Sequence, residues 1–331
     1  MGAFGVVVIG RNEGARLRAC FGSLRAAGKF PIVYVDSGST DASLDIAQEF
    51  DVHGLSLDMS SPFSAARARN FGAKYLQKKF LGLQFVQFVD GDCVIDGGWL
   101  NAATAYLDAN QQCAAVVGHL KELFPQASIY NRLCSLEWRS RAGVITDFGG
   151  FGGISMVRMA IFTQLDGFRE DVIAGEDSEF AVRTFLAGHE IHKLDAPMAQ
   201  HDANIHSFFQ WWQRAKRSGH AMAQRFSLNG KTQVQDCRKE LKSVAVWAIL
   251  VPLLAISISG LALFYGVLFL VAAYSYLSFR IFSYRHRLGD SLSDSLIYSF
   301  FNVLGKFAQV QGIFKFCRNY LRKRYEIIEY K

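Results

Sequence analysis

The chain has 331 residues, 50% of them hydrophobic, and carries a formal net charge of +7. This length is enough to bury a sizeable core and predicts one large or two smaller domains. The charge is uneven, because residues 1–204 carry 18 Lys and Arg against 23 Asp and Glu, whereas residues 205–331 carry 18 against 6. The six cysteines show no CxxC pairing or regular spacing, which argues against a zinc site and a disulfide framework and fits a reducing cytoplasm.

Short apolar runs alternate with helix-like stretches through the first half of the chain, which is typical of successive βα units. The predicted strands cover residues 4–9, 32–36, 52–55, 85–90 and 114–120. The predicted helices cover residues 15–27, 41–50, 64–78 and 98–110, with a further helix near residues 177–187. This order predicts a Rossmann-like α/β domain over residues 1–204, built on a mainly parallel sheet.

The rest of the chain predicts a helical, membrane-associated region. Residues 205–227 mix aromatic and basic side chains at helical spacing, which fits either an interfacial amphipathic helix or a surface helix packed on the α/β domain. Residues 244–279 form a run of 36 residues without a charged side chain, with Lys and Arg on both flanks. This run predicts an apolar hairpin that turns at Ser259-Gly260 and has both ends in the cytoplasm. The alternative is a buried helical pair in a soluble protein.

The first two strand ends lack the fingerprints of common nucleotide-binding loops. The stretches VVVIGRNEGARL and VDSGSTDASLDIA match neither GxGxxG nor GxxxxGK[ST], so hydride transfer and ATP hydrolysis lose their usual sequence support. Asp36 ends the second predicted strand and precedes the turn at residues 37–39. Its carboxylate is either a hydrogen-bond acceptor for a nucleotide base or ribose, or a plain turn residue.

Charged side chains follow on the next helix and strand. Arg67 and Arg69 in FSAARARNFGA could bind a nucleotide diphosphate through their guanidinium forks, or form a solvated helix face. Asp90 and Asp92 end the apolar strand at residues 85–90, and alternate residues of an extended segment point the same way. Ligands of open α/β sheets bind at the carboxyl ends of strands, so this D-x-D stretch predicts a site for a divalent cation and a nucleotide.

Two later segments carry further candidates. The segment GEDSEF places Glu176, Asp177 and Glu179 at the start of a predicted helix. One of these carboxylates could act as a general base. The alternative is that their negative charges only stabilise the N-terminus of the helix. The stretch FGGFGG either lets the backbone approach an acceptor closely or only shapes a turn. Its glycines are Gly149, Gly150, Gly152 and Gly153.

Taken in this order, the segments resemble the family 2 glycosyltransferases of the GT-A fold. The resemblance covers about residues 4–201 and rests on VVVIGRNE, VDSGSTD, ARARN, VDGDC, DGFRE and GEDSEF. It implies an inverting transferase that uses a nucleoside-diphosphate sugar and a divalent ion, Mn²⁺ or Mg²⁺. In such an enzyme Asp36 would hold the base or ribose, and Asp90 and Asp92 would hold the nucleotide sugar and the metal.

The same resemblance implies Asp177 as the catalytic base, with Glu176 supporting it. A later histidine often completes the metal site in this family; His201 is the best-placed candidate and His206 the alternative, and for either the other reading is a plain structural histidine. Processive members carry Q-x-x-R-W beside their membrane helices, and QWWQR at residues 210–214 does not fit that pattern. Transfer of a single sugar is therefore expected.

The expected organisation is a catalytic domain at residues 1–204, an interfacial helix and linker at 205–243, and an apolar hairpin with a basic amphipathic tail at 244–331. The basic residues flank an apolar run, so membrane lipids are the expected partner rather than nucleic acid. The expected acceptor is a saccharide or a lipid-linked saccharide, in cell-surface polysaccharide or glycolipid synthesis at the cytoplasmic face of the inner membrane. The alternatives are a nucleotidyltransferase with the same α/β nucleotide domain and a non-catalytic membrane scaffold.

Overall fold

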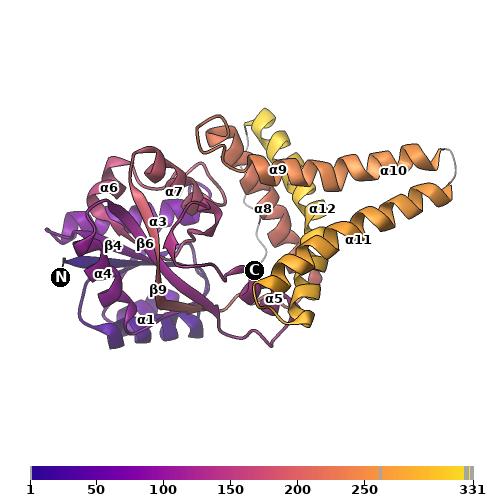
Figure 1. The fold of residues 1–331 in the computed structure, drawn as a ribbon. Coiled ribbons are helices and arrows are strands. Elements are labelled where there is room, and N and C mark those ends of the chain that lie inside the picture. The colour runs from indigo at the N-terminus through magenta and orange to yellow at the C-terminus, as the bar shows by residue number, and fades with distance from the viewer. Residues whose placement is uncertain (1, 261–262, 324–327, 329–331) are drawn as a thin grey trace. The chain divides into compact units, whose positions relative to one another are not determined.

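The computed structural model describes residues 2–260, 263–323 and 328. The chain divides into two compact units, each described here by itself. The α/β unit comprises Met1–Phe124 and Glu137–Ala203, and the helical unit comprises Pro125–Leu136 and Asn204–Lys331 (Figure 1). The functional division into domains at residues 204 and 243 stays a prediction.

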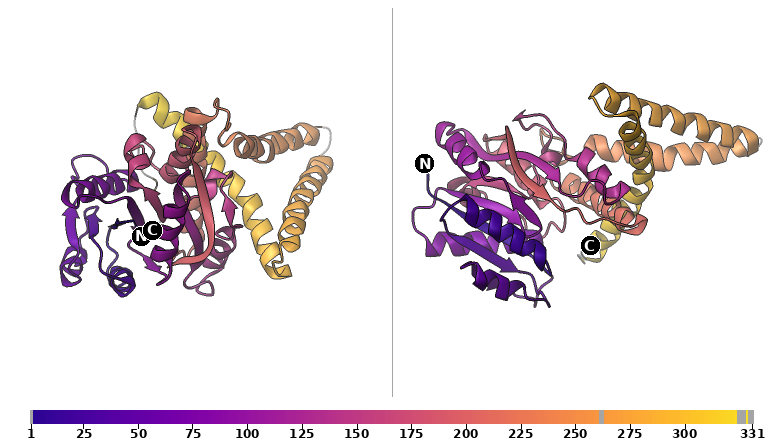
Figure 2. Two further views of the ribbon diagram at one scale, coloured as in Figure 1. Left: turned by 60° about the vertical axis from the view of Figure 1, so that its left-hand side comes forward. Right: turned by 90° about the horizontal axis from the view of Figure 1, so that it is seen from below.

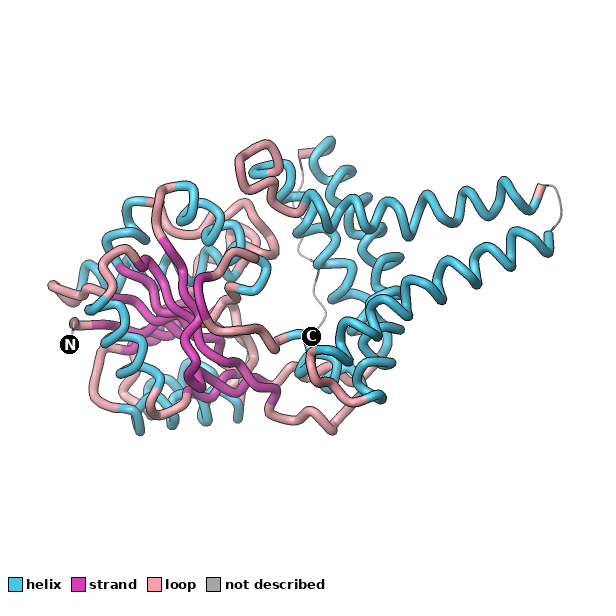
Figure 3. Tube along the Cα trace, in the orientation of Figure 1, coloured by secondary structure: helices cyan, strands magenta, loops and turns pink. Residues whose placement is uncertain are grey.

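The α/β unit is built on one nine-stranded sheet. The strands are β1 (Phe4–Gly10), β2 (Ile32–Asp36), β3 (His53–Ser56), β4 (Phe85–Asp90), β5 (Cys93–Ile95), β6 (Cys113–Glu122), β7 (Gly143–Val144), β8 (Ser155–Arg158) and β9 (Glu190–His201). Their order is β3-β2-β1-β4-β8-β6-β9-β5, and β7 pairs with β9. Figure 3 shows the strands in magenta. All five strands expected from the sequence are present.

The longest ladders of the sheet are parallel, as predicted. Strands β1 to β4 run parallel to one another, and β6 runs parallel to β9. Strand β8 lies antiparallel between β4 and β6, and the short strands β5 and β7 pair antiparallel with β9. Buried side chains fill β1 and β2, because strands covered on both faces need apolar residues at every position.

Helices cover both faces of this sheet. They are α1 (Ala15–Ala27), α2 (Ser43–Glu49), α3 (Ala65–Lys79), α4 (Trp99–Ala109), α6 (Met159–Gln164) and α7 (Glu176–Leu186), with a 3₁₀ turn η1 at Phe148–Gly150. Helices α1 and α3 lie on opposite faces (Figure 2). This arrangement leaves the carboxyl ends of β1, β2 and β4 free of helices that follow directly, so loops meet there.

The helical unit contains α5 (Ile129–Glu137), α8 (Phe208–Asn229), α9 (Arg238–Ala245), a π-helical turn η2 (Val246–Leu250), α10 (Val251–Ser259), α11 (Leu263–Arg287) and α12 (Leu292–Arg322). The helix expected at residues 205–227 is α8, and its buried face packs against α12. Trp211 and Phe301 stack edge to face with centroids 4.8 Å apart. At Gly312 an added Cβ would lie 1.9 Å from Lys216 O, so the two helix backbones touch closely.

Two long apolar helices form the predicted hairpin. They run over Arg238–Ser259, with mean hydropathy 2.2, and Leu263–Arg287, with mean hydropathy 1.5, and both are long and apolar enough to cross a membrane. Only 17% and 11% of their apolar windows are buried. Ile256 is 68% exposed and Phe264 is 70% exposed. The alternative of a buried helical pair therefore does not describe these residues.

Candidate active site

The candidate site begins where β1, β2 and β4 end side by side. Gly10 of β1 pairs with Asp36 of β2, and Ile9 pairs with Asp90 of β4. These pairings place the two aspartates on either side of the end of β1. Asn12, which the sequence analysis did not single out, ties the first two loops together: its side-chain oxygen accepts from Thr40 N at 2.7 Å.

Asp36 is buried and its carboxylate organises the turn that follows it. It accepts hydrogen bonds from Gly38 N at 3.1 Å, Ser39 N at 2.9 Å and the Tyr34 hydroxyl at 3.1 Å. Both carboxylate oxygens are engaged in this way. Asp36 therefore acts as a turn residue, and its contact with a nucleotide stays a prediction.

Arg67 braces the loop that precedes α3. Its guanidinium donates to the backbone oxygens of Asp58 at 2.9 Å, Ser61 at 2.9 Å and Pro62 at 2.7 Å. Ser64 caps α3 by accepting from the Arg67 backbone N–H at 3.2 Å. A diphosphate contact by Arg67 stays a prediction and would compete with these carbonyls.

Arg69 is the centre of the site rather than a surface residue. It is 3% exposed, and it donates to Asp90 Oδ1 at 2.7 Å and to Glu176 Oε1 at 2.5 Å. Burial opposes the charge of this guanidinium, but the carboxylates of Asp90, Glu176 and Asp177 raise its pKa, so Arg69 stays protonated. The D-x-D stretch and the start of α7, far apart in sequence, are thus joined through one arginine.

Gly153 explains how Arg69 reaches these carboxylates. A Cβ at this position would lie 2.2 Å from Arg69 Nη2, so only glycine lets the guanidinium pass. Gly150 and Gly152 face open space, and Asp147 Oδ1 accepts from Gly149 N at 3.2 Å. The close approach at Gly153 is made by Arg69, and an acceptor role for the other three glycines stays a prediction.

Asp92 and His201 form the metal-competent part of the site. Asp92 Oδ2 lies 3.2 Å from His201 Nε2, and Trp138 stacks on the imidazole at 5.0 Å between ring centroids. The ligand atoms of Asp92, Cys93 and His201 all lie within 4.8 Å of one another. The alternative histidine, His206, belongs to the helical unit. A carboxylate beside an imidazole is a suitable donor set for a divalent ion.

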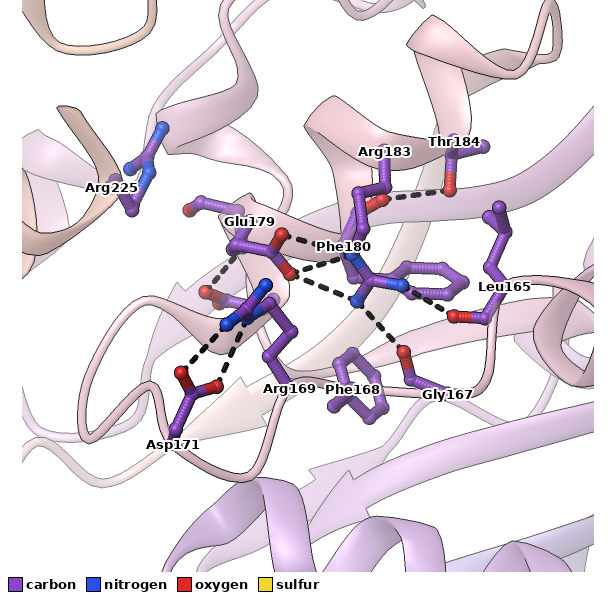
Figure 4. A network of polar contacts seen from close by, with 12 residues as sticks. Leu165, Gly167, Phe168, Arg169, Asp171, Glu179, Phe180, Arg183, Thr184 and Arg225 are labelled. Atoms are coloured by element: carbon purple, nitrogen blue, oxygen red, sulfur yellow. Dashed lines mark hydrogen bonds and ion pairs between the residues drawn. The ribbon is translucent and has the colours of Figure 1, made fainter. Parts of the chain in front are cut away.

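The three acidic residues at the start of α7 differ in what they contact. Glu176 is paired with Arg69, and Glu179 is 1% exposed and accepts from Arg183 Nε at 2.9 Å. Arg183 also donates to Leu165 O and Gly167 O, so the Glu179–Arg183 ion pair has a structural role in holding this loop (Figure 4). Asp177 is half-buried, and among the described contacts its carboxylate accepts only from Ser178 N at 2.6 Å. Of the three, Asp177 is the carboxylate available to a substrate.

Comparison with known proteins gives the family of the α/β unit. Residues 5–165 match the family model "Glycosyl transferase family 2". The chain carries a family 2 glycosyltransferase domain. No curated protein sequence matches the chain. The family match favours a glycosyltransferase over the two alternatives, a nucleotidyltransferase and a non-catalytic scaffold.

Solved structures of low sequence identity share the fold of this glycosyltransferase. The mannosyltransferase PcManGT from Pyrobaculum calidifontis, in complex with GDP-Man and Mn²⁺, has a TM-score of 0.60 at 16% identity over 96% of this chain and 87% of its own. Residues 1–349 of S. aureus TarS with UDP give 0.52 at 19% identity over 99% and 95%. Against a longer TarS structure, the match covers 75% of this chain but only 43% of TarS. The predicted GT-A fold is confirmed.

Two further residues of the candidate site were not singled out in the sequence. Glu122 is buried and pairs with His201 across β6 and β9; it accepts from Ala203 N at 3.0 Å, and burial raises its pKa. Asn70 holds the DGFRE loop by donating to Phe168 O at 2.8 Å and accepting from Phe168 N at 2.9 Å. Asn70 lies in the ARARN segment and Glu122 in no such segment, but neither contact is visible in the sequence because the partners are distant along the chain.

Proposed function

We propose that this enzyme transfers one sugar from a nucleoside-diphosphate sugar to a hydroxyl of a lipid-linked saccharide, with inversion at the anomeric carbon. The observation that supports it most is the Arg69 bridge, which ties Asp90 to Glu176, the neighbour of Asp177. Donor-side and acceptor-side carboxylates therefore belong to one rigid cluster. Rigid placement of reacting groups is a main source of rate enhancement.

Asp92 and His201 are the residues that would hold the divalent ion. When bound, such an ion offsets the negative charge of the departing nucleoside diphosphate. Asp36, at the end of β2, would receive the base or ribose if it exchanged one of its turn hydrogen bonds. Asp90 keeps one oxygen on Arg69, and its side chain is 32% exposed, which leaves part of the carboxylate for the donor.

Asp177 is proposed as the general base. It stands in the first turn of α7 and lies close enough to Arg69 for the two charges to interact. The acceptor hydroxyl would give its proton to this carboxylate as its oxygen displaces the diphosphate. One base and one direct displacement invert the anomeric configuration. Glu176 cannot take this role while it is buried and paired with Arg69.

The proposed location is the cytoplasmic face of the inner membrane. The exposed apolar helices of the hairpin support it, and so do Arg238, Lys239 and Lys242 before the apolar run and Arg280 after it. A lipid-linked acceptor would be presented at the same surface, in polysaccharide or glycolipid synthesis. A large exposed apolar surface needs lipid or protein to cover it.

The test compares Asp177→Asn with Asp45→Asn, an exposed carboxylate in the first turn of α2. Nucleoside diphosphate release is measured across a panel of nucleotide sugars, with membrane extract as acceptor and with Mn²⁺, Mg²⁺ or chelator. Asp177→Asn should keep its donor affinity by calorimetry and lose about 10²–10⁴-fold in transfer rate, while Asp45→Asn should match the wild type. Normal transfer by Asp177→Asn would rule this residue out as the base, and no transfer by the wild type with any donor would overturn the proposed reaction.

A further inference from the structure

The proposed metal pair has a third potential donor that the sequence analysis left out. Cys93 follows Asp92 directly, and its Sγ lies 3.6 Å from Asp92 Oδ1. It also stands opposite His201 in the antiparallel ladder of β5 and β9. Directly opposed residues of such a ladder project from the same face of the sheet. The thiol and the imidazole therefore share one side of the site.

Two of the distances among these three groups suit ligands around one ion. Tetrahedral bond lengths of about 2.0–2.3 Å to oxygen, nitrogen and sulfur put ligand atoms about 3.3–3.7 Å apart. Asp92 Oδ2 and His201 Nε2 are 3.2 Å apart, and Cys93 Sγ and Asp92 Oδ1 are 3.6 Å apart. The ligand atoms of all three residues lie within 4.8 Å of one another.

A second Asp-Cys pair in the chain shows what distinguishes Cys93. Cys237 Sγ lies 3.5 Å from Asp236 Oδ1, a contact of the same kind. There, however, the carboxylate is taken by Arg225 at 2.6 Å and 3.0 Å. Among the described residues, only the cluster at Cys93 brings three metal-ligating groups together. Arg225 therefore pairs with Asp236, whereas the imidazole of His201 lies beside Asp92.

Building on the proposed function, we infer that Cys93 is the third protein ligand of the metal and makes the site prefer thiophilic ions. On binding, the thiol proton passes to solvent and a sulfur–metal bond forms, with no change of oxidation state. Thiolate ligands favour Zn²⁺, Co²⁺ and Cd²⁺, whereas Mg²⁺ prefers a site made of oxygen donors. The site should therefore rank Cd²⁺ and Co²⁺ above Mg²⁺.

The experiment titrates the full-length protein in detergent with Co²⁺ alone, and again with UDP and with GDP. A ligand-field band in the visible reports a bound ion, and a near-ultraviolet charge-transfer band reports a sulfur ligand. Wild type and Cys237→Ser should show both bands, whereas Cys93→Ser should keep only the first. Cys93→Ser should also lower Cd²⁺ affinity at least about 10-fold while changing Mg²⁺ affinity little. Cys317→Ser, which removes an exposed cysteine, should behave like the wild type.

The two bands separate this inference from the proposed function on which it rests. A ligand-field band without a charge-transfer band in the wild type would overturn the thiolate ligand and leave the Asp92–His201 site intact. Loss of the charge-transfer band in Cys237→Ser or Cys317→Ser, but not in Cys93→Ser, would also overturn it. Absence of both bands under all conditions would overturn the metal site itself. If Cys93→Ser does not fold, equal affinities of the wild type for Cd²⁺ and Mg²⁺ would refute the inference.

Discussion

Gly153 is the position at which one methyl group tests the arrangement around Arg69. In Gly153→Ala the new Cβ would lie 2.2 Å from Arg69 Nη2 and 3.0 Å from Cζ. Real Cβ atoms do not approach so closely, so the guanidinium must move. Movement breaks the contacts of Arg69 with Asp90 and Glu176, and Glu176, which is 6% exposed, loses its ion pair with Arg69.

The expected cost follows from which half of the bridge is buried. Breaking a buried ion pair costs about 3–5 kcal/mol when one partner is deleted. Here the guanidinium is displaced rather than removed, and the partly exposed Asp90 contact contributes little because solvent screens it. We therefore expect a loss of about 1–3 kcal/mol in unfolding free energy. Because displacement by an ångström can cost about 10²-fold in rate, sugar transfer should fall by more than the loss of stability alone explains.

The matched control is Gly150→Ala, because an added Cβ there meets nothing within 4 Å. Both variants are compared by thermal unfolding, donor affinity and transfer rate on the same preparations. A second comparison places Gly153→Ala in an Arg69→Met background, where the methyl group should cost little because the group it displaces is gone. Equal behaviour of Gly153→Ala and Gly150→Ala, or an equal cost of Gly153→Ala with and without Arg69, would contradict the role given to Gly153.

Two further predictions concern the helical unit. Ile256→Lys combined with Phe264→Lys places charges on the exposed apolar faces of the hairpin and should reduce flotation with vesicles, since each lysine costs about 2.5–3.5 kcal/mol at the bilayer centre. The control is Leu81→Lys, at an apolar position that is 91% exposed in the α/β unit. Unchanged flotation of the double variant would contradict a membrane hairpin. Burial, with Lys315 and Arg217 nearby, lowers the pKa of His220 to about 4. Because the folded-state pKa lies below the unfolded one, the unfolded state binds the proton first, and stability should fall as pH drops through about 6.5 to 4, by about 2 kcal/mol at pH 5. His220→Leu should flatten this part of the pH dependence in thermal unfolding scans, and an unchanged slope would count against it.

The strands that could be predicted are those whose apolar run is unbroken. Residues 32–36 and 85–90 match β2 and β4 residue for residue, because strands buried on both faces carry a continuous signal. Strand β9, with the sequence EIHKLDAPMAQH, was missed because its polar and apolar residues do not alternate strictly and it contains a proline. Strand β8 was missed because its four residues end in an arginine.

The site was predictable as a set of residues but not as a set of contacts. The D-x-D and E-D segments are recognisable in the sequence, and the structure brings Asp92 to His201. The partners of Arg69 stand 21 and 107 residues away from it, and its direction depends on a missing side chain at Gly153. Cys93 carries no spacing signal, since its relation to His201 exists only through the pairing of β5 with β9.

Helix α5 gives the chain an unusual continuity. Pro125–Leu136 belongs to the helical unit, although the sequence on both sides of it belongs to the α/β unit. Within the helical unit, Arg132 pairs with Asp294 at 2.6 Å, and Arg285 donates to Leu136 O at 3.1 Å. The backbone therefore changes units three times along its length. A recombination event with one junction therefore cannot exchange the helical unit alone between related enzymes. The donor sequence would have to supply α5 as well as α12.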